Sequence, residues 1–315
     1  MADVIKTATR DAYGKALVEL GQKNDKVIVF DADLAAATKT GMFKKEFPER
    51  FIDCGIAESN MMGVAAGMAT AGYTVFASSF AMFAAGRAFE QVRNTIGYPH
   101  LNVKIGATHA GISVGEDGAS HQCCEDIALM RTIPGMTIIN PADDIEARLA
   151  VMAAAEIDGP VYMRFGRLAV PRIFDEDYKF EIGKGVYLKE GTDVTIIATG
   201  LMVERALQAA EMLAAEGISA AVINMATIKP LDRDIIIDAA KKTGAIVTAE
   251  EHSVIGGLGS AVAEVICETT PVPVMKVGVE DTFGKSGPAL ELLEIFGLNA
   301  ENICQKAKNA VEAKK

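Results

Sequence analysis

Two kinds of segment alternate along this chain, and the alternation constrains its fold more than any other feature. Short apolar runs rich in β-branched residues are typical of buried parallel strands, and they occur at residues 27–30, 73–77, 102–107, 137–140 and 161–164. Longer stretches with helical patterns lie among them, at 7–20, 59–70, 80–95 and 143–155. Asp143 and Asp144 suit the N-terminus of the last helix. The pattern predicts a doubly wound α/β domain.

The alternation breaks between residues 166 and 185, where Gly166, Pro171 and Gly183 surround an acidic run, as is typical of a linker. A second unit follows, with strands expected at 194–198, 220–224, 245–249 and 272–277 and helices at 203–216, 232–242, 260–268 and 288–296. We therefore predict two doubly wound α/β domains with mainly parallel sheets, at 1–165 and 186–315, joined by a linker at 166–185.

Charge and hydropathy exclude several classes of function. The formal net charge is -11, with 42 acidic against 31 basic residues, and this balance disfavours a nucleic-acid partner. The long uncharged stretch at 61–86 is interrupted by Gly63, Gly67 and Gly72, so it predicts a helix, a turn and a buried strand rather than a membrane span. The first residues lack an apolar stretch of signal-peptide length, and we expect a cytoplasmic protein.

A glycine-rich segment, Gly256-Gly257-Leu258-Gly259, raises the question of nucleotide binding. It lacks the GxGxxG spacing that lets a pyrophosphate approach a helix N-terminus. We predict a tight turn that leads into a helix.

Two polar segments are the candidates for chemistry. In 55–61, Gly-Ile-Ala-Glu-Ser-Asn-Met, Glu58 stands at the start of an apolar helix, where a buried carboxyl can give a strong hydrogen bond. In 108–122, half of the four histidines lie with Glu116 and Asp117 among glycines, a composition too polar for a core. The alternatives are a capping acid at a helix start and a long surface connection.

These segments together resemble the pyrimidine-binding half of transketolase: Gly-Ile-Ala-Glu at 55–58, Thr-His-Ala-Gly at 108–111 and Gly-Glu-Asp-Gly-Ala-Ser-His-Gln at 115–122. The order of features extends the resemblance across essentially the whole chain. It implies a thiamine diphosphate enzyme in which Glu58 bonds a pyrimidine nitrogen. That bond promotes the imino tautomer, through which the cofactor deprotonates its own thiazolium carbon.

The resemblance also assigns side chains around the cofactor. In segment 79–83, Phe83 would stack on the pyrimidine and Phe80 would line the same pocket, although two core phenylalanines are the alternative. Asp33 matches a family aspartate close to the cofactor, with a turn acid at a strand end as the alternative.

Substrate contacts follow from the same resemblance. Asp117 would face the ketose hydroxyls and His121 the region of the carbonyl oxygen, with His109 beside them. An imidazole can exchange protons with sugar hydroxyls near neutral pH, as a two-carbon transfer between sugars requires.

The phosphate of a sugar phosphate substrate would be bound by Arg167, whose guanidinium suits a bidentate contact; an interdomain salt bridge is the alternative. One departure concerns the same phosphate. Ala37 stands where the family usually has a serine, so Thr38 or Lys39 takes its place or the substrate differs.

The family's Gly-Asp-Gly motif and following asparagine, which bind metal and diphosphate, are missing, so we expect no metal ligands in this chain. The resemblance therefore implies the C-terminal subunit of a split transketolase. Its partner would be an N-terminal subunit that carries Gly-Asp-Gly and holds Mg²⁺, in a heterotetramer whose cofactor spans two chains.

Three alternatives stay open. Deoxyxylulose-phosphate synthase and the beta subunit of oxoacid dehydrogenases share the architecture, and Gly-Ile-Ala-Glu also suits the synthase, but the Gly-Glu-Asp-Gly form favours transketolase. A regulatory or scaffold chain with a decayed site is the non-enzyme alternative. The intact Glu58, Phe83, Asp117 and His121 argue against decay.

Overall fold

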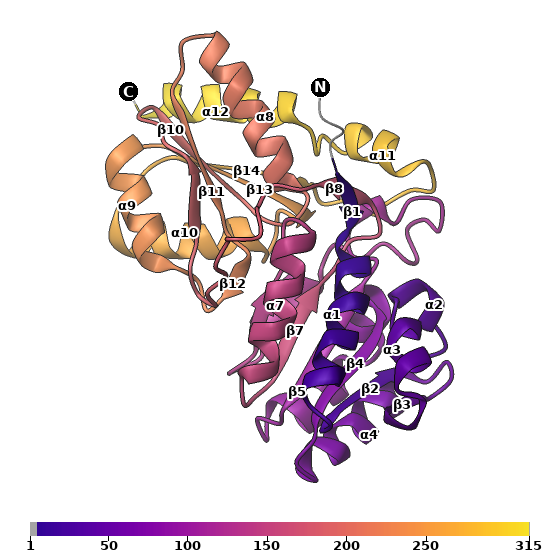
Figure 1. The fold of residues 1–315 in the computed structure, drawn as a ribbon. Coiled ribbons are helices and arrows are strands. Elements are labelled where there is room, and N and C mark those ends of the chain that lie inside the picture. The colour runs from indigo at the N-terminus through magenta and orange to yellow at the C-terminus, as the bar shows by residue number, and fades with distance from the viewer. Residues whose placement is uncertain (1–4, 315) are drawn as a thin grey trace.

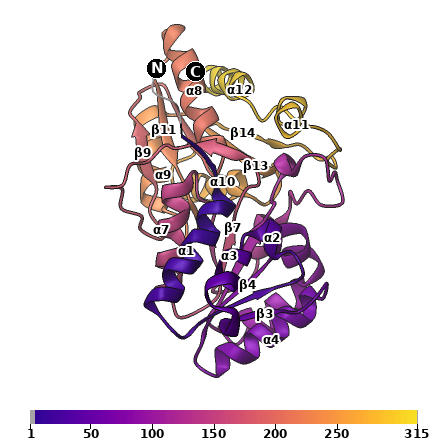
Figure 2. The same cartoon turned by 45° about the vertical axis from the view of Figure 1, so that its right-hand side comes forward.

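The computed structural model describes residues 5–314 as two α/β units that lie side by side (Figures 1 and 2). A seven-stranded sheet forms the centre of the first unit and a five-stranded sheet the centre of the second. Both sheets are mainly parallel, so the predicted fold class is confirmed. Within the described range, no helix is long and apolar enough to cross a bilayer.

The first sheet has the order β12-β6-β7-β5-β4-β2-β3. Its strands are β2 (Val27–Asp31), β3 (Phe51–Asp53), β4 (Thr74–Phe80), β5 (Val103–Thr108), β6 (Thr137–Ile139), β7 (Val161–Arg164) and β12 (Thr227–Lys229). All except β12 pair in parallel. Parallel strands end at the same edge of a sheet, so the residues that follow β2, β4, β5 and β7 gather at one edge.

Helices cover both faces of this sheet because alternate strand residues point to opposite sides. Val27 and Val29 pack toward α1 (Thr9–Lys23), α3 (Gly41–Glu46) and α7 (Asp144–Glu156). Ile28 and Phe30 pack toward α4 (Glu58–Thr70) and α6 (Asp126–Arg131). The short α2 (Ala35–Thr38) follows β2.

The helix expected at 80–95 differs from the prediction. Phe80 belongs to β4, and the following residues form a π-helical segment (Met82–Arg87), a short α5 (Phe89–Gln91) and a second π-helical segment (Val92–Gly97). The composition of the segment carries no signal for the wider turn, which is frequent at functional sites.

The second sheet has the order β14-β13-β10-β11-β9, with β9 antiparallel. Its strands are β9 (Val186–Lys189), β10 (Val194–Ala198), β11 (Ala220–Asn224), β13 (Ile246–Ser253) and β14 (Val274–Val279). Helices α8 (Met202–Ala215) and α12 (Ala300–Ala313) cover one face, and α9 (Arg233–Thr243) and α10 (Leu258–Thr269) cover the other. Helix α11 (Ala289–Ile295) precedes α12.

The glycine-rich segment forms the predicted turn into a helix, because α10 begins directly after Gly257. A buried carboxylate already occupies the N-terminus of this helix. Glu250 accepts hydrogen bonds from the N–H groups of Leu258 at 2.7 Å and Gly259 at 2.8 Å. These contacts satisfy amides that a pyrophosphate would otherwise bind.

The segment between the two units is structured. β8 (Ala169–Pro171) pairs with β1 (Lys6–Ala8), and Phe174 is buried in the core of the second unit. Glu146 of α7 accepts hydrogen bonds from the Tyr178 hydroxyl at 2.9 Å and the Asn224 amide at 2.7 Å. Burial raises the pKa of Glu146 to about 7. These contacts connect the first unit, the linker and the second unit.

Candidate active site

Glu58 is the first residue of α4, and its side chain is only 1% exposed. Its Oε2 atom accepts a hydrogen bond from Arg87 Nη1 at 2.8 Å, in an ion pair whose arginine is 49% exposed. The N-cap residue of α4 is Ala57, and no side chain forms a capping hydrogen bond there. The buried Glu58 carboxylate at the start of α4 is therefore paired with the half-exposed cation of Arg87.

Aromatic rings lie close to Arg87, the partner of Glu58. The Arg87 guanidinium lies over the ring of Phe83, 4.5 Å from its centroid, and Phe83 is 6.0 Å from Phe80 in a stacked arrangement. Phe80 is the last residue of β4, and its ring stacks on that of His109 with 3.8 Å between the ring centroids. The ring of His121 meets that of Phe83 edge-on, with 5.3 Å between the centroids. The structure thus brings both predicted aromatic residues and both predicted histidines together.

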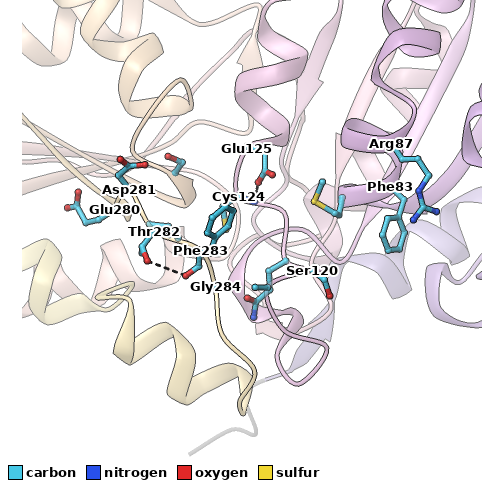
Figure 3. A pocket seen from close by; sticks show the side chains of 15 residues that line it. Phe83, Arg87, Ser120, Cys124, Glu125, Glu280, Asp281, Thr282, Phe283 and Gly284 are labelled. Carbon is cyan, nitrogen blue, oxygen red and sulfur yellow. Dashed lines mark hydrogen bonds between the residues drawn. The ribbon is translucent and has the colours of Figure 1, made fainter.

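Phe83 and Arg87 also line a cavity of about 710 Å³ between the two units (Figure 3). Ser120 and Glu125 of the first unit lie on its wall, and Asp281 and Phe283 come from the second unit. Phe283 is 87% exposed. The cavity is large enough for a small organic ligand.

His109 directly follows β5 and is held by two hydrogen bonds. Its Nε2 lies 2.8 Å from Arg10 Nη1, and its Nδ1 lies 2.9 Å from Thr108 Oγ1. Because a guanidinium can only donate, Nε2 is the acceptor and Nδ1 carries the proton. Burial, together with the charges of Arg10 and Arg167, lowers the pKa of His109 to about 3. His109 is therefore a neutral hydrogen-bonding group at neutral pH.

Arg10 is a site residue that the sequence reasoning missed. It lies on α1, donates to the Ala37 carbonyl at 3.1 Å, and its buried Nε has no hydrogen-bond partner within residues 5–314. Its charge acts on His109 together with those of Lys39 and Arg167. No sequence signal distinguished Arg10 from the other polar residues of its helix.

Arg167 follows β7 and donates hydrogen bonds to the Val114 carbonyl and to Glu116 Oε2, the latter at 3.1 Å. Both members of this ion pair are solvent-exposed, at 38% and 66%. Such a pair stabilises the fold little. Arg167 can therefore exchange Glu116 for an anionic ligand at small cost.

The two candidates to replace the missing serine differ in their surroundings. Thr38 is fully buried, and its hydroxyl donates to Asp31 Oδ2 at 2.7 Å. Lys39 has a left-handed backbone with φ 71° and an ion pair to Asp11 at 3.2 Å. Of the two candidates, only Lys39 has a charged group at the surface.

Asp33, which was predicted to lie close to the cofactor, is exposed with φ 61°, and its N–H donates to Asp53.

The predicted substrate loop, residues 108–122, forms hydrogen bonds with the second unit. Glu251 Oε1 accepts a hydrogen bond from the Ser113 N–H at 2.6 Å, and Gln122 Nε2 donates to the Lys285 carbonyl at 2.8 Å. Ser113 has the Gly-x-Ser-x-Gly spacing of hydrolase nucleophiles, but it is buried and no histidine in the described chain bonds it. Asp117 is exposed at the tip of the loop.

Comparison with known proteins identifies the family of this chain. Residues 5–172 match the family model of the transketolase pyrimidine-binding domain, and residues 183–303 match that of the transketolase C-terminal domain. A solved structure described as a split gene transketolase, inactive beta4 tetramer, superposes with a TM-score of 0.92 at 58% identity, covering 98% of this chain and 99% of that one.

Two relatives are described as transketolase subunits. The chain is 47% identical to a 6-deoxy-6-sulfo-D-fructose transketolase subunit of Clostridium sp. (strain MSTE9), over 97% of this chain and 95% of the relative. It is 40% identical to an apulose-4-phosphate transketolase subunit of Phocaeicola vulgatus, over 97% and 98%. The chain therefore belongs to the transketolase family, as a C-terminal chain of the split-gene type.

Proposed function

We propose that this chain is the pyrimidine-binding subunit of a thiamine-diphosphate-dependent transketolase. In this role it contributes to reversible transfer of a two-carbon ketol unit from a ketose phosphate to an aldose phosphate. The observation that carries the proposal is that one side chain at the wall of a cavity, Arg87, contacts both a buried carboxylate, Glu58, and an aromatic ring, Phe83. An aminopyrimidine needs an edge-on hydrogen bond and a stacking surface, and these residues supply both.

Each remaining residue has a proposed task. Thiamine diphosphate supplies, when bound, the nucleophilic carbon that accepts the two-carbon unit. Glu58 would hold the pyrimidine nitrogen, and Phe80 would keep His109 in place by stacking on it. His109, His121 and Asp117 would bind the sugar's oxygen atoms. The neutral imidazole of His109 supports hydrogen bonding rather than proton donation.

The sugar phosphate would be bound by Arg10, Lys39 and Arg167. All three charges act on His109, so an anion placed beside that ring would meet several cations. Because relatives use a sulfonated and a phosphorylated sugar, the anionic end is the shared feature on which the proposal relies.

A partner subunit completes the proposed enzyme. It would contribute the Gly-Asp-Gly motif, Mg²⁺ and the diphosphate contacts, in a heterotetramer with two copies of each chain. A cytoplasmic location stays a prediction.

Replacement of Glu58 by glutamine tests the proposal in the reconstituted complex, assayed with xylulose phosphate and ribose phosphate at saturating cofactor. Glu58→Gln keeps size and polarity but cannot drive the tautomer shift, so turnover should fall by at least about a hundredfold. Glu264→Gln is the matched control, since it breaks a surface ion pair of 2.7 Å with Arg131. Retention of more than about a tenth of the activity by Glu58→Gln would restrict Glu58 to a structural role.

A further inference from the structure

Arg87 contacts both of the groups proposed to bind the pyrimidine. Its Nη1 lies 2.8 Å from Glu58 Oε2, and its guanidinium carbon lies 4.5 Å from the centroid of Phe83. Among residues 5–314, no other side chain makes a recorded hydrogen bond to the Glu58 carboxylate. One guanidinium thus bonds the carboxylate and lies over the ring.

An aminopyrimidine requires the same two contacts, an edge on Glu58 and a face on Phe83. A guanidinium and a pyrimidine cannot both have them. We infer that Arg87 is a displaceable occupant of the pyrimidine pocket, which covers Glu58 in the unloaded protein and must leave before the cofactor can bind. This inference rests on the proposed function, because it takes the pyrimidine as the incoming group.

The structure gives Arg87 room to leave. The side chain is 49% exposed, in contrast to the 1% exposure of Glu58, and it faces the cavity of about 710 Å³ (Figure 3). Arg87 ends the π-helical segment that also carries Phe83, so the backbone can keep the ring in place while the long side chain turns away. When Arg87 leaves, the buried Glu58 carboxylate loses its partner, and this costs free energy until another group bonds the carboxylate.

This competition reduces the cofactor's affinity. Part of the binding free energy of the pyrimidine is spent on breaking the ion pair between Arg87 and Glu58. A side chain at position 87 that makes no contact with Glu58 removes this cost.

The experiment is a calorimetric titration of thiamine diphosphate into the complex of this chain with its diphosphate-binding partner, at saturating Mg²⁺. Arg87→Met keeps the length of the side chain and removes the cation, and it should lower the dissociation constant about tenfold. Arg87→Gln keeps a hydrogen-bond donor for Glu58 and should give an intermediate change, which also covers a failure of the methionine variant to assemble. Arg93→Met is the control, because Arg93 is exposed and bonds only its neighbour Asn94 within the described chain.

Unchanged or weaker binding by both Arg87 variants, with normal binding by the wild-type complex, would overturn the inference and leave the proposed function intact. A lower melting temperature without any change in affinity would likewise identify Arg87 as a structural partner only. Absence of binding by the wild-type complex would contradict the proposed function, and this inference with it.

Discussion

At the scale of single residues, the proposed anion site combines cations from separate elements. Arg10 comes from α1, Lys39 follows α2 and Arg167 follows β7. The ion pair of Arg167 is the more open to solvent, because its partner Glu116 is 66% exposed, against 32% for Asp11, the partner of Lys39. Arg167 is therefore the residue whose replacement changes anion binding with the smallest effect on the fold.

Arg167→Ala should raise the Michaelis constant for phosphorylated sugars roughly ten- to a hundredfold, which corresponds to the ~1.5 to 3 kcal/mol of a charge-assisted hydrogen bond. Unphosphorylated acceptors should be affected little. Glu116→Gln is the control, because it removes the same ion pair but keeps the guanidinium. An equal effect on both classes of acceptor would indicate a structural salt bridge instead.

His109 provides a test that depends on pH. A free imidazole has a pKa of about 6.5, so below that pH the unfolded chain binds a proton that folded His109 does not take up until about pH 3. The residue therefore costs no stability above pH 6.5. As the pH falls below 6.5, it lowers the free energy of unfolding by up to ~1.4 kcal/mol per pH unit.

Replacement of this imidazole should accordingly reduce the acid sensitivity of the fold. In denaturant titrations between pH 8 and pH 5, His109→Gln should lose less stability than the wild type, because glutamine can bond Arg10 and Thr108 without titrating. Equal losses in the two proteins would show that His109 binds a proton in the folded state within this range.

The sequence could predict Glu58 but not its partner. Glu58 is marked by its place before an apolar helix, which is a local pattern. Arg87 lies 29 residues away from Glu58, and Arg10 lies 99 residues away from His109. Their roles arise from contacts between distant segments, and a local pattern carries no information about such contacts.

At the scale of elements, Tyr13 brings α1 close to β4 and β5 at the edge of the first sheet. The Tyr13 hydroxyl is 2.6 Å from Ser78 Oγ, and the Tyr13 ring stacks on Phe165 at 4.6 Å, near Arg167 in the chain. A Cβ atom at Gly106 would overlap the Tyr13 hydroxyl. Glycine is required here because the helix and the strand approach so closely.

Gly106→Ala should therefore destabilise the isolated chain by about 1 to 3 kcal/mol through overpacking. Gly67→Ala on α4 is the control, since a Cβ there meets nothing within 4 Å. Alanine in that helix should be neutral or stabilising by up to about 1 kcal/mol. The free energy of unfolding of both variants, measured with denaturant, decides; equal stabilities would contradict the packing argument.

Most strands of both sheets were predicted because they are buried apolar runs, and β7, β10 and β11 have the predicted bounds. Helix α12 was not predicted, although Ile303, Ala307 and Ala310 have helical spacing. The π-helical segments could not be predicted, because their composition does not distinguish them from an α-helix.

At the scale of the whole molecule, the two units share a sheet. β12, a strand from the second half of the chain, pairs with β6 at the edge of the first sheet. The linker adds β8 and the buried Phe174. The sequence predicted two units but not their contacts, since a three-residue edge strand has too little pattern to assign. The boundaries at 165 and 186 stay predictions.

The central claim is that this chain binds only the pyrimidine side of a shared cofactor. Calorimetry with thiamine diphosphate and Mg²⁺ tests it most directly, on the chain alone, on an N-terminal subunit that carries Gly-Asp-Gly, and on the two combined. The account predicts weak or no binding by this chain alone and tight, Mg²⁺-dependent binding by the combined subunits. Tight Mg²⁺-dependent binding by the isolated chain would contradict it.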